Sequence, residues 1–261
     1  MLRWCGYCQT FLGEAPPFDK LVITHGVCET CAELALDFTP QNIEHAHTLQ
    51  DILAELSLAG SRADMQAAKA AIRTATAAHM QPVDMLLGLV APLLFEIGEE
   101  WRKGRITVAT EHRFTEFFEQ VFALLEPRAL ALVGTPSGAT GQPDALVMNA
   151  WGNRHTLAAR VLSLWLGARG LRTQLLEPPP PPEEVAAIII RLQPRMVFVS
   201  VALSEHIESV RALADMVSSI PESHRPRFVV GGSAVKMGLV PDTPGLELVP
   251  DIHDLNLEAA V

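Results

Sequence analysis

The stretch that decides the fold is residues 98–112, GEEWRKGRITVATEH. Apolar side chains recur at helical spacing on both sides of it, over residues 86–94 and over residues 114–124. Lys103-Gly104-Arg105 carries the turn signal between these two patterns. The sequence therefore predicts two antiparallel helices joined by a short turn, which brings the end of the first helix and the start of the second to one end of a bundle.

A tryptophan, an acid and an imidazole lie around this turn. Trp101 ends the first predicted helix, and Glu111 and His112 lie in the first turn of the second. Gathered at one end of a bundle, they can cover a flat ligand. A Trp followed after nine residues by Glu-His resembles the signature of the helical cap domain in B12-dependent photoreceptors of the CarH type. The resemblance implies that these residues lie over the upper face of adenosylcobalamin. The alternative is a helix hairpin with a buried Trp and a surface acid.

The composition describes an acidic chain with ample material for a core. Of its 261 residues, 49% are apolar and 19% are charged, and the net charge is −10 with a pI of about 5.3. No basic run offers the clustered Lys and Arg that binding to a phosphate backbone requires, so direct DNA binding is disfavoured. The apolar stretches are shorter than the roughly 20 residues that span a bilayer, and the first residues lack the apolar region of a signal peptide. We therefore expect a cytoplasmic protein with no membrane segment.

All four cysteines lie within the first 31 residues, as Cys5, Cys8, Cys28 and Cys31. Two C-x-x-C pairs separated by 19 residues predict a tetrahedral zinc site, and metal binding would supply the folding energy that so short a segment lacks. Disulfides are the alternative, which a reducing cytoplasm disfavours. The segment also resembles a short Cys-rich element found beside sensor domains in bacterial signalling proteins. We predict a zinc-binding module at residues 1–38.

The rest of the chain divides by pattern into a helical part and an α/β part. Residues 39–130 predict a four-helix-bundle cap domain that starts at Thr39-Pro40, and Gly60-Ser61 is expected to end its first helix and cap its second. Residues 131–143 predict a linker. Residues 144–261 alternate strands with helices, which is typical of a flavodoxin-like (Rossmann-like) doubly wound parallel sheet. The predicted fold class is a multi-domain α/β chain with a small four-cysteine module and a helical cap.

Polar or glycine-rich segments follow three of the predicted strands, at residues 149–155, 200–204 and 231–233. Because ligands of such sheets bind at the carboxyl ends of the strands, we expect these segments to converge on one crevice. Their spacing resembles that of flavodoxin-like B12-binding domains. Those domains carry Asp-x-His-x-x-Gly, then 41 residues, then Ser-x-Leu, then 26 to 28 residues, then Gly-Gly.

Each of these motifs has a counterpart in this chain. Residues 153–158, NRHTLA, stand for the first, Ser200-Val201-Ala202 follows after 41 residues, and Gly231-Gly232 follows after 28 more. The resemblance implies that His155 is the lower ligand of cobalt in place of the cofactor's own benzimidazole. It also implies that Ser200 bonds near the displaced tail base and that the glycines let the backbone approach the tail. A Rossmann-like domain with an incidental His is the alternative.

Four positions depart from the family patterns. Asn153 replaces the Asp that orients the imidazole, Ala158 replaces the Gly where the tail passes, and Ala202 replaces an apolar Leu. In the photoreceptors a second His directly follows the cap Trp and captures cobalt after light breaks the cobalt–carbon bond. Arg102 occupies that position here, and His112 is the nearby substitute.

The pairing of a helical cap with a B12-binding domain implies two functions. The intact Trp101-x9-Glu111-His112 motif favours a light sensor. We therefore expect a cobalamin-binding signalling regulator, not an enzyme, that senses adenosylcobalamin and light and acts through contacts with a protein partner, such as a transcription regulator or a kinase. One alternative is a corrinoid methyl carrier for a separate methyltransferase. Others are a haem or tetrapyrrole sensor, with His155 and His112 as iron ligands, and a scaffold that binds no tetrapyrrole. The sequence leaves a homo-oligomer open.

Overall fold

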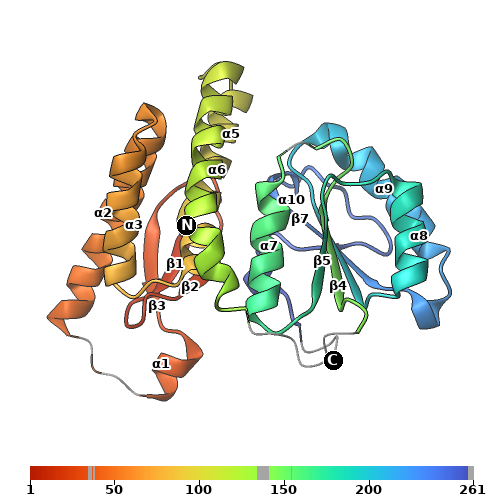
Figure 1. The fold of residues 1–261 in the computed structure, drawn as a ribbon, viewed down its shortest axis with the longest axis horizontal. Coiled ribbons are helices and arrows are strands. Elements are labelled where there is room, and N and C mark those ends of the chain that lie inside the picture. The colour runs from red at the N-terminus through yellow and green to blue at the C-terminus, as the bar shows by residue number, and fades with distance from the viewer. Residues whose placement is uncertain (35–36, 38, 134–140, 154, 258–261) are drawn as a thin grey trace. The chain divides into compact units, whose positions relative to one another are not determined.

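The computed structural model describes residues 1–34, 37, 39–133, 141–153 and 155–257, in two compact units, Met1–Ala129 and Leu130–Val261 (Figure 1). The first unit holds a small cysteine-containing sheet and a set of helices, and the second holds a five-stranded parallel sheet. This architecture confirms the predicted fold class. The finer predicted domain boundaries stay a prediction, and residues 134–140 of the predicted linker lie outside the described residues. No described helix is both long and apolar enough to cross a bilayer.

The first unit opens with a three-stranded sheet that carries the cysteines. Its elements are β1 (Leu2–Cys5), β2 (Phe11–Glu14), β3 (Ile23–Gly26) and the short helix α1 (Glu29–Glu33). The strand order is β2-β1-β3, with β1 antiparallel to β2 and parallel to β3. Because β1 is central, Trp4 and Cys5 at its end lie between the two other strands and are both buried.

Helices form the rest of the first unit: α2 (Pro40–Arg62), α3 (Met65–Ala77), α4 (Pro82–Met85), the π-helical turn η1 (Leu86–Val90), α5 (Ala91–Arg102) and α6 (Val108–Leu130). The predicted start at Thr39-Pro40 and the predicted break at Lys103-Gly104-Arg105 are confirmed.

The predicted end of the first helix is wrong. Helix α2 runs through Gly60 to Arg62, and Asp64 caps α3 in place of Ser61, because its Oδ1 accepts hydrogen bonds from two backbone N–H groups at 3.0 Å. Gly60 serves packing, since a Cβ there would lie 2.6 Å from the rings of Phe114 and Phe118. A glycine that admits a neighbouring helix gives the same sequence signal as one that ends a helix.

The second unit is a parallel sheet with the strand order β5-β4-β6-β7-β8. Its strands are β4 (Ala145–Asn149), β5 (Thr173–Leu176), β6 (Met196–Ser200), β7 (Arg227–Gly231) and β8 (Glu247–Leu248). The connections contain α7 (Leu157–Ala168), α8 (Pro182–Leu192), η2 (Ser204–His206), α9 (Ile207–Ser218), η3 (Glu222–His224) and α10 (Ser233–Lys236), and η4 (Ile252–Asp254) follows β8. This order reverses direction between β4 and β6, where such sheets bind ligands.

The two faces of this sheet have different covers. Alternate strand residues pack with α8 and α9 in one hydrophobic core, among them Met148, Val199 and Val230. Helix α7 lies on the opposite face, beside β4 and β5 (Figure 1). Because side chains alternate along a strand, the residues between these core positions point toward the α7 face.

Candidate functional site

Three strand ends meet on the α7 face of the second unit. Asn149, Ser200 and Gly231 are register neighbours across β4, β6 and β7, and the backbone N–H of Val201 donates to the carbonyl of Gly231 at 2.8 Å just beyond them. All three alternate with residues of the core on the α8–α9 face. The predicted convergence of residues from these strand ends therefore takes place on one face of the sheet.

Gly232 follows this row at a position that only glycine fits. Its φ is +99°, and a Cβ there would lie 2.7 Å from the carbonyl oxygen of Val201 and 2.9 Å from Ser200 Oγ. The backbone thus passes directly beside the Ser200 hydroxyl. This is the close approach that the Gly-Gly motif predicts, and it leaves the edge open for a ligand atom.

His155 lies on the loop between β4 and α7 and is exposed. Asn153, which precedes it by two residues, is buried, and its Oδ1 accepts a hydrogen bond from the backbone N–H of His155 at 3.0 Å. Asn153 therefore fixes the loop through its backbone, where the family's Asp orients the ring. Ala158 is exposed in the first turn of α7, and Ala202 is half-buried just past β6.

The sequence analysis missed the most telling polar group at this edge. Asn149 is only 2% exposed, and its Oδ1 has no hydrogen-bond partner among the described residues. A buried acceptor without a partner is costly, so this atom fits a site that a ligand donor completes. The signal was present, because Asn149 is the one polar residue that ends the buried strand ALVMN.

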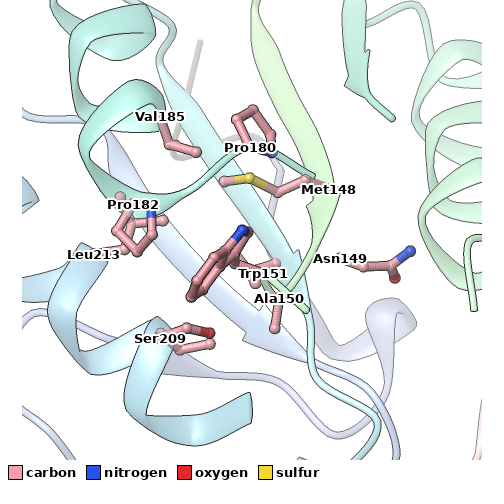
Figure 2. Close-up of a pocket in the computed structure, with 11 residues that line it drawn as sticks. Met148, Asn149, Ala150, Trp151, Pro180, Pro182, Val185, Ser209 and Leu213 are labelled. Atoms are coloured by element: carbon pink, nitrogen blue, oxygen red, sulfur yellow. The ribbon is translucent and has the colours of Figure 1, made fainter. Parts of the chain in front are cut away.

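A second hollow lies nearby but faces the other way. Figure 2 shows Trp151 with Met148 and Pro182 around it, while Asn149 points to the opposite side of β4. The hollow has a volume of about 10 Å³, which is at most room for one water molecule. The α8–α9 side therefore offers no room for a cofactor, and the α7 side carries the candidate site.

The cap residues belong to the first unit. Trp101 lies in the last turn of α5 and Glu111 in the first turn of α6, with His112 directly after it. Glu111 is 12% exposed and its Oε1 accepts a hydrogen bond from the Thr115 hydroxyl at 2.8 Å, whereas the His112 side chain is 57% exposed. The hairpin thus brings the end of α5 and the start of α6 together, with a fixed acid and an exposed imidazole.

Arg102 is tied down beside Trp101. Its Nε and Nη2 donate to the two carboxylate oxygens of Glu99 at 2.8 and 2.7 Å. The hydrogen bonds from Arg102 lower the pKa of the buried Glu99 carboxyl and outweigh the effect of its burial. A permanently charged guanidinium cannot ligate cobalt, so the position of the second photoreceptor His holds a structural ion pair.

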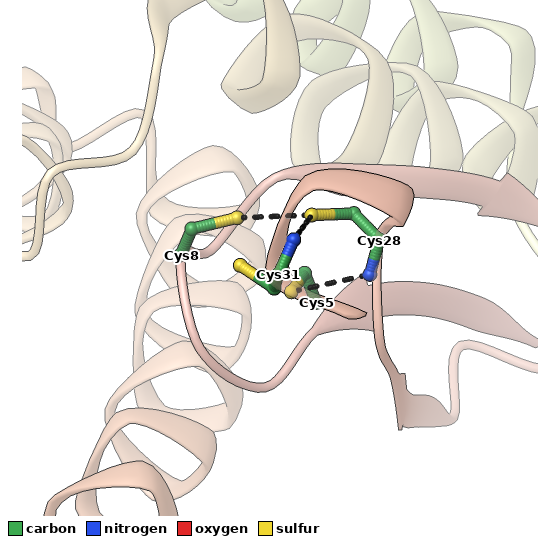
Figure 3. A group of neighbouring side chains, drawn as sticks. All are labelled: Cys5, Cys8, Cys28 and Cys31. Atoms are coloured by element: carbon green, nitrogen blue, oxygen red, sulfur yellow. Dashed lines mark hydrogen bonds between the residues drawn. The ribbon is translucent and has the colours of Figure 1, made fainter. Parts of the chain in front are cut away.

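The four cysteines come together in the small module (Figure 3). Their sulfur atoms all lie within 4.8 Å of one another, and Cys8 Sγ and Cys28 Sγ are 3.6 Å apart. With zinc–sulfur distances near 2.3 Å, a tetrahedral site has sulfur–sulfur distances of about 3.8 Å. All four are free thiols, so the geometry fits one zinc ion and contradicts the disulfide alternative.

Backbone N–H groups point at these sulfur atoms. The N–H of Cys28 donates to Cys5 Sγ at 3.5 Å, and the N–H of Cys31, in the first turn of α1, donates to Cys28 Sγ at 3.4 Å. Burial raises the pKa of the Cys5 thiol, but hydrogen bonds from backbone N–H groups of Cys28, Cys8 and Tyr7 outweigh it and bring the pKa to about 7. Burial raises the pKa of Cys31. Such N–H···S bonds stabilise the thiolates that a metal requires.

Comparison with known proteins assigns both larger parts of the chain. Residues 52–126 match one family model described as a B12 binding domain, and residues 143–238 match a second with the same description. The cysteine module precedes both matched regions. No curated protein matches the sequence.

Solved structures of corrinoid proteins share the fold. The Methanosarcina barkeri monomethylamine corrinoid protein is similar with a TM-score of 0.63 and 17% identity, over 81% of this chain and 96% of that one. The methanol:cobalamin methyltransferase complex MtaBC from Methanosarcina barkeri gives 0.38 and 16%, over 85% and 84%. A cobalamin-binding protein from Desulfitobacterium hafniense DCB-2 gives 0.37 and 15%, over 71% and 89%. The last two scores are too low to support a structural argument. The chain therefore carries two consecutive B12 binding domains and is a cobalamin-binding protein with the fold of a corrinoid protein.

Proposed function

We propose that this protein is a light-responsive regulator that binds adenosylcobalamin and acts through contacts with a protein partner. The observation that carries the proposal is the hairpin of the helical B12 binding domain, in which Trp101 ends α5 while Glu111 and His112 begin α6. A large ring with a fixed carboxylate suits the adenosyl group, since the ring covers its flat face and the acid accepts hydrogen bonds from hydroxyl groups.

The second domain would hold the rest of the cofactor. His155, exposed on its loop, is the proposed axial ligand, and Ser200 with the Gly232 backbone lines the path of the nucleotide tail. Asn149 Oδ1 is the acceptor for a donor of that tail. Bound adenosylcobalamin supplies a cobalt–carbon bond that light breaks. Trp101 would then lose its contact with the adenosyl group, and the surface around the hairpin would change for a partner. The net charge of −10 disfavours nucleic acid as that partner and leaves a transcription regulator or a kinase.

A corrinoid methyl carrier is the second candidate. Its specific support is the fold similarity to the monomethylamine corrinoid protein across 96% of that chain. In this role the protein would carry methylcobalamin for a separate methyltransferase and would not be an enzyme by itself. Arg102 favours this candidate over a photoreceptor that needs a His at that position, because its guanidinium is held by Glu99.

We further propose that Cys5, Cys8, Cys28 and Cys31 bind one zinc ion. The support is the cluster of four sulfur atoms within 4.8 Å and the N–H groups directed at them. Metal analysis of the purified protein is expected to give one zinc per chain, and a metal-free folded protein would contradict the assignment.

Absorption spectroscopy tests the proposed function. The purified protein is reconstituted in the dark with adenosylcobalamin, methylcobalamin or haem, and each sample is then illuminated with green light. The regulator is expected to prefer adenosylcobalamin, to show a dark spectrum that depends on His155, and to give a stable protein-held product in light. Preference for methylcobalamin without a stable light product favours the carrier. Retention of haem without cobalamin binding overturns both.

A further inference from the structure

The cysteine module is joined to the helical domain through two aromatic rings. Trp4 is 0% exposed and stacks at a tilt against the buried Phe11, with ring centroids 5.1 Å apart. Both rings rest on Gly88. A Cβ at Gly88 would lie 2.6 Å from Phe11 Cδ2 and closer still to Trp4 Cζ2. The rings therefore touch the bare helix backbone, and only glycine admits them.

Gly88 lies in an unusual part of the helix. It belongs to the π-helical turn η1 (Leu86–Val90), which joins α4 to α5. Such turns interrupt α-helices mostly at functional positions. The helical segment that starts at Pro82 continues through this turn to Arg102 and so carries Trp101. Whatever holds Trp4 on Gly88 therefore also holds the helix of the cap tryptophan.

The metal site lies next to this contact in the chain. Trp4 directly precedes Cys5, the first thiol of the cluster, in the central strand β1. A metal ion that fixes Cys5 thus fixes the end of the strand that positions the Trp4 ring.

A second contact joins the turn between Cys5 and Cys8 to the start of α2. The buried Asn42 donates through Nδ2 to the carbonyl of Gly6 at 2.9 Å. Its Oδ1 accepts hydrogen bonds from the backbone N–H and the hydroxyl of Thr39 at 2.8 and 2.9 Å. One side chain therefore connects the metal-binding turn to the N-terminus of α2.

The module also follows α5 toward the Trp101 turn. Residues 18–21 face residues 95–105 across a cavity of about 250 Å³. The contact at Gly88 is therefore one end of a longer interface along the same helix.

We infer that the four-cysteine site is a metal-dependent lock on the helical B12 binding domain. The inference rests on the proposed zinc site. A module of three strands of four residues each has too small a core to keep its shape without metal. Loss of the ion releases Trp4 from the π-helical turn and Gly6 from Asn42, and the helix that ends at Trp101 loosens. Metal occupancy thus decides whether the cap is ordered.

Hydrogen exchange of the full chain tests the lock. Amide exchange is compared between the zinc-loaded protein and the protein stripped of zinc by a chelator under reducing conditions, both without cobalamin. Residues 82–102 are expected to exchange about tenfold faster or more without zinc. Helix α8 (Pro182–Leu192) in the second unit serves as the internal reference and is expected to change less than about twofold.

Matched glycine variants separate the lock from a general loss of stability. Gly88→Ala is expected to keep one zinc per chain but to exchange fast over residues 82–102 with or without the ion. Gly98→Ala, in the same helix with no atom within 4 Å of its added Cβ, is expected to behave as the wild type. Should Gly88→Ala not fold, Asn42→Ala replaces it, with fast exchange at the start of α2 in the presence of zinc.

Three results would overturn the inference. One is equal exchange over residues 82–102 at zinc contents of one and zero. Another is a folded Gly88→Ala protein, or its replacement Asn42→Ala, with wild-type zinc dependence. The third is a wild-type chain that takes up no zinc, which removes the zinc site along with the lock. Cobalamin binding, measured by absorption on the same samples, reports on the proposed function separately.

Discussion

The cysteine cluster and the strand-end edge are built in opposite ways. The cluster draws its four ligands from residues 5–31, and the sulfur atoms already lie within 4.8 Å of one another. The edge draws its groups from segments between residues 149 and 232, with His155 exposed and Asn149 Oδ1 without a partner among the described residues. The first is shaped for an ion that holds the fold, and the second is left incomplete for a ligand that comes and goes.

The largest expected effect is at the cluster. Cys31→Ala removes a buried ligand, so zinc content is expected to fall from one to zero and the first unit to lose about 3 kcal/mol or more of stability. Metal analysis and thermal unfolding followed by circular dichroism measure this. His25→Ala, an exposed residue outside the cluster, is the control and is expected to keep the metal. Zinc retained by Cys31→Ala would break the comparison.

Gly232→Ala is expected to have the next largest effect, on the second unit. The added Cβ meets Val201 and Ser200 at a φ of +99°, so we expect a loss of about 1–3 kcal/mol in unfolding free energy together with loss of cobalamin binding. Gly170→Ala is the matched control, because its φ is +85° and its Cβ meets no atom within 4 Å. Equal losses in denaturant unfolding would show that backbone strain alone acts at Gly232.

His155→Ala sharpens the comparison, because an exposed ligand residue contributes to binding without contributing to the fold. Unfolding free energy is expected to stay within about 0.5 kcal/mol, while cobalamin affinity falls about 10- to 100-fold and the cofactor's absorption spectrum shifts. His224→Ala, on η3 before β7, is the control for an exposed His at the other end of the sheet. An unchanged spectrum in His155→Ala would remove His155 from the site.

Asn149→Ala tests the incomplete acceptor. Cobalamin affinity is expected to fall about fivefold, the equivalent of one hydrogen bond near 1 kcal/mol. Affinity for cobinamide, which lacks the nucleotide tail, is expected to stay the same. Titrations of both corrinoids by absorption measure this difference, and an equal fall for the two would place Asn149 away from the tail.

The smallest effect concerns the ion pair beside Trp101. Hydrogen bonds from Arg102 hold the pKa of Glu99 below its ordinary value of 4.5, so the pair stabilises the fold above that pH. Its contribution, about 1 kcal/mol or less, is lost as the pH falls through the lower pKa of the folded state. Unfolding free energies between pH 6 and pH 3 are expected to fall less steeply in Glu99→Gln than in the wild type. Parallel profiles would show that the pair contributes nothing.

Local patterns were read correctly where one segment decides the outcome. The break at Lys103-Gly104-Arg105 and the C-x-x-C pairs each follow from neighbours in the chain. Gly60 was misjudged, because its role comes from Phe114 and Phe118 more than 50 residues away. Asn149 was overlooked because its lack of a partner depends on which face of the sheet it occupies.

The sequence by itself determined the alternation of strands and helices, the spacing of the three strand-end motifs and the number of thiols, because periodicity and short spacings encode these. Only the tertiary structure decided that Asn149, Ser200 and Gly231 share one face, that Asn153 bonds the backbone of His155, and that Trp4 rests on Gly88. These depend on contacts between distant segments, and the free energy of such packing is set by shape, which no local pattern records.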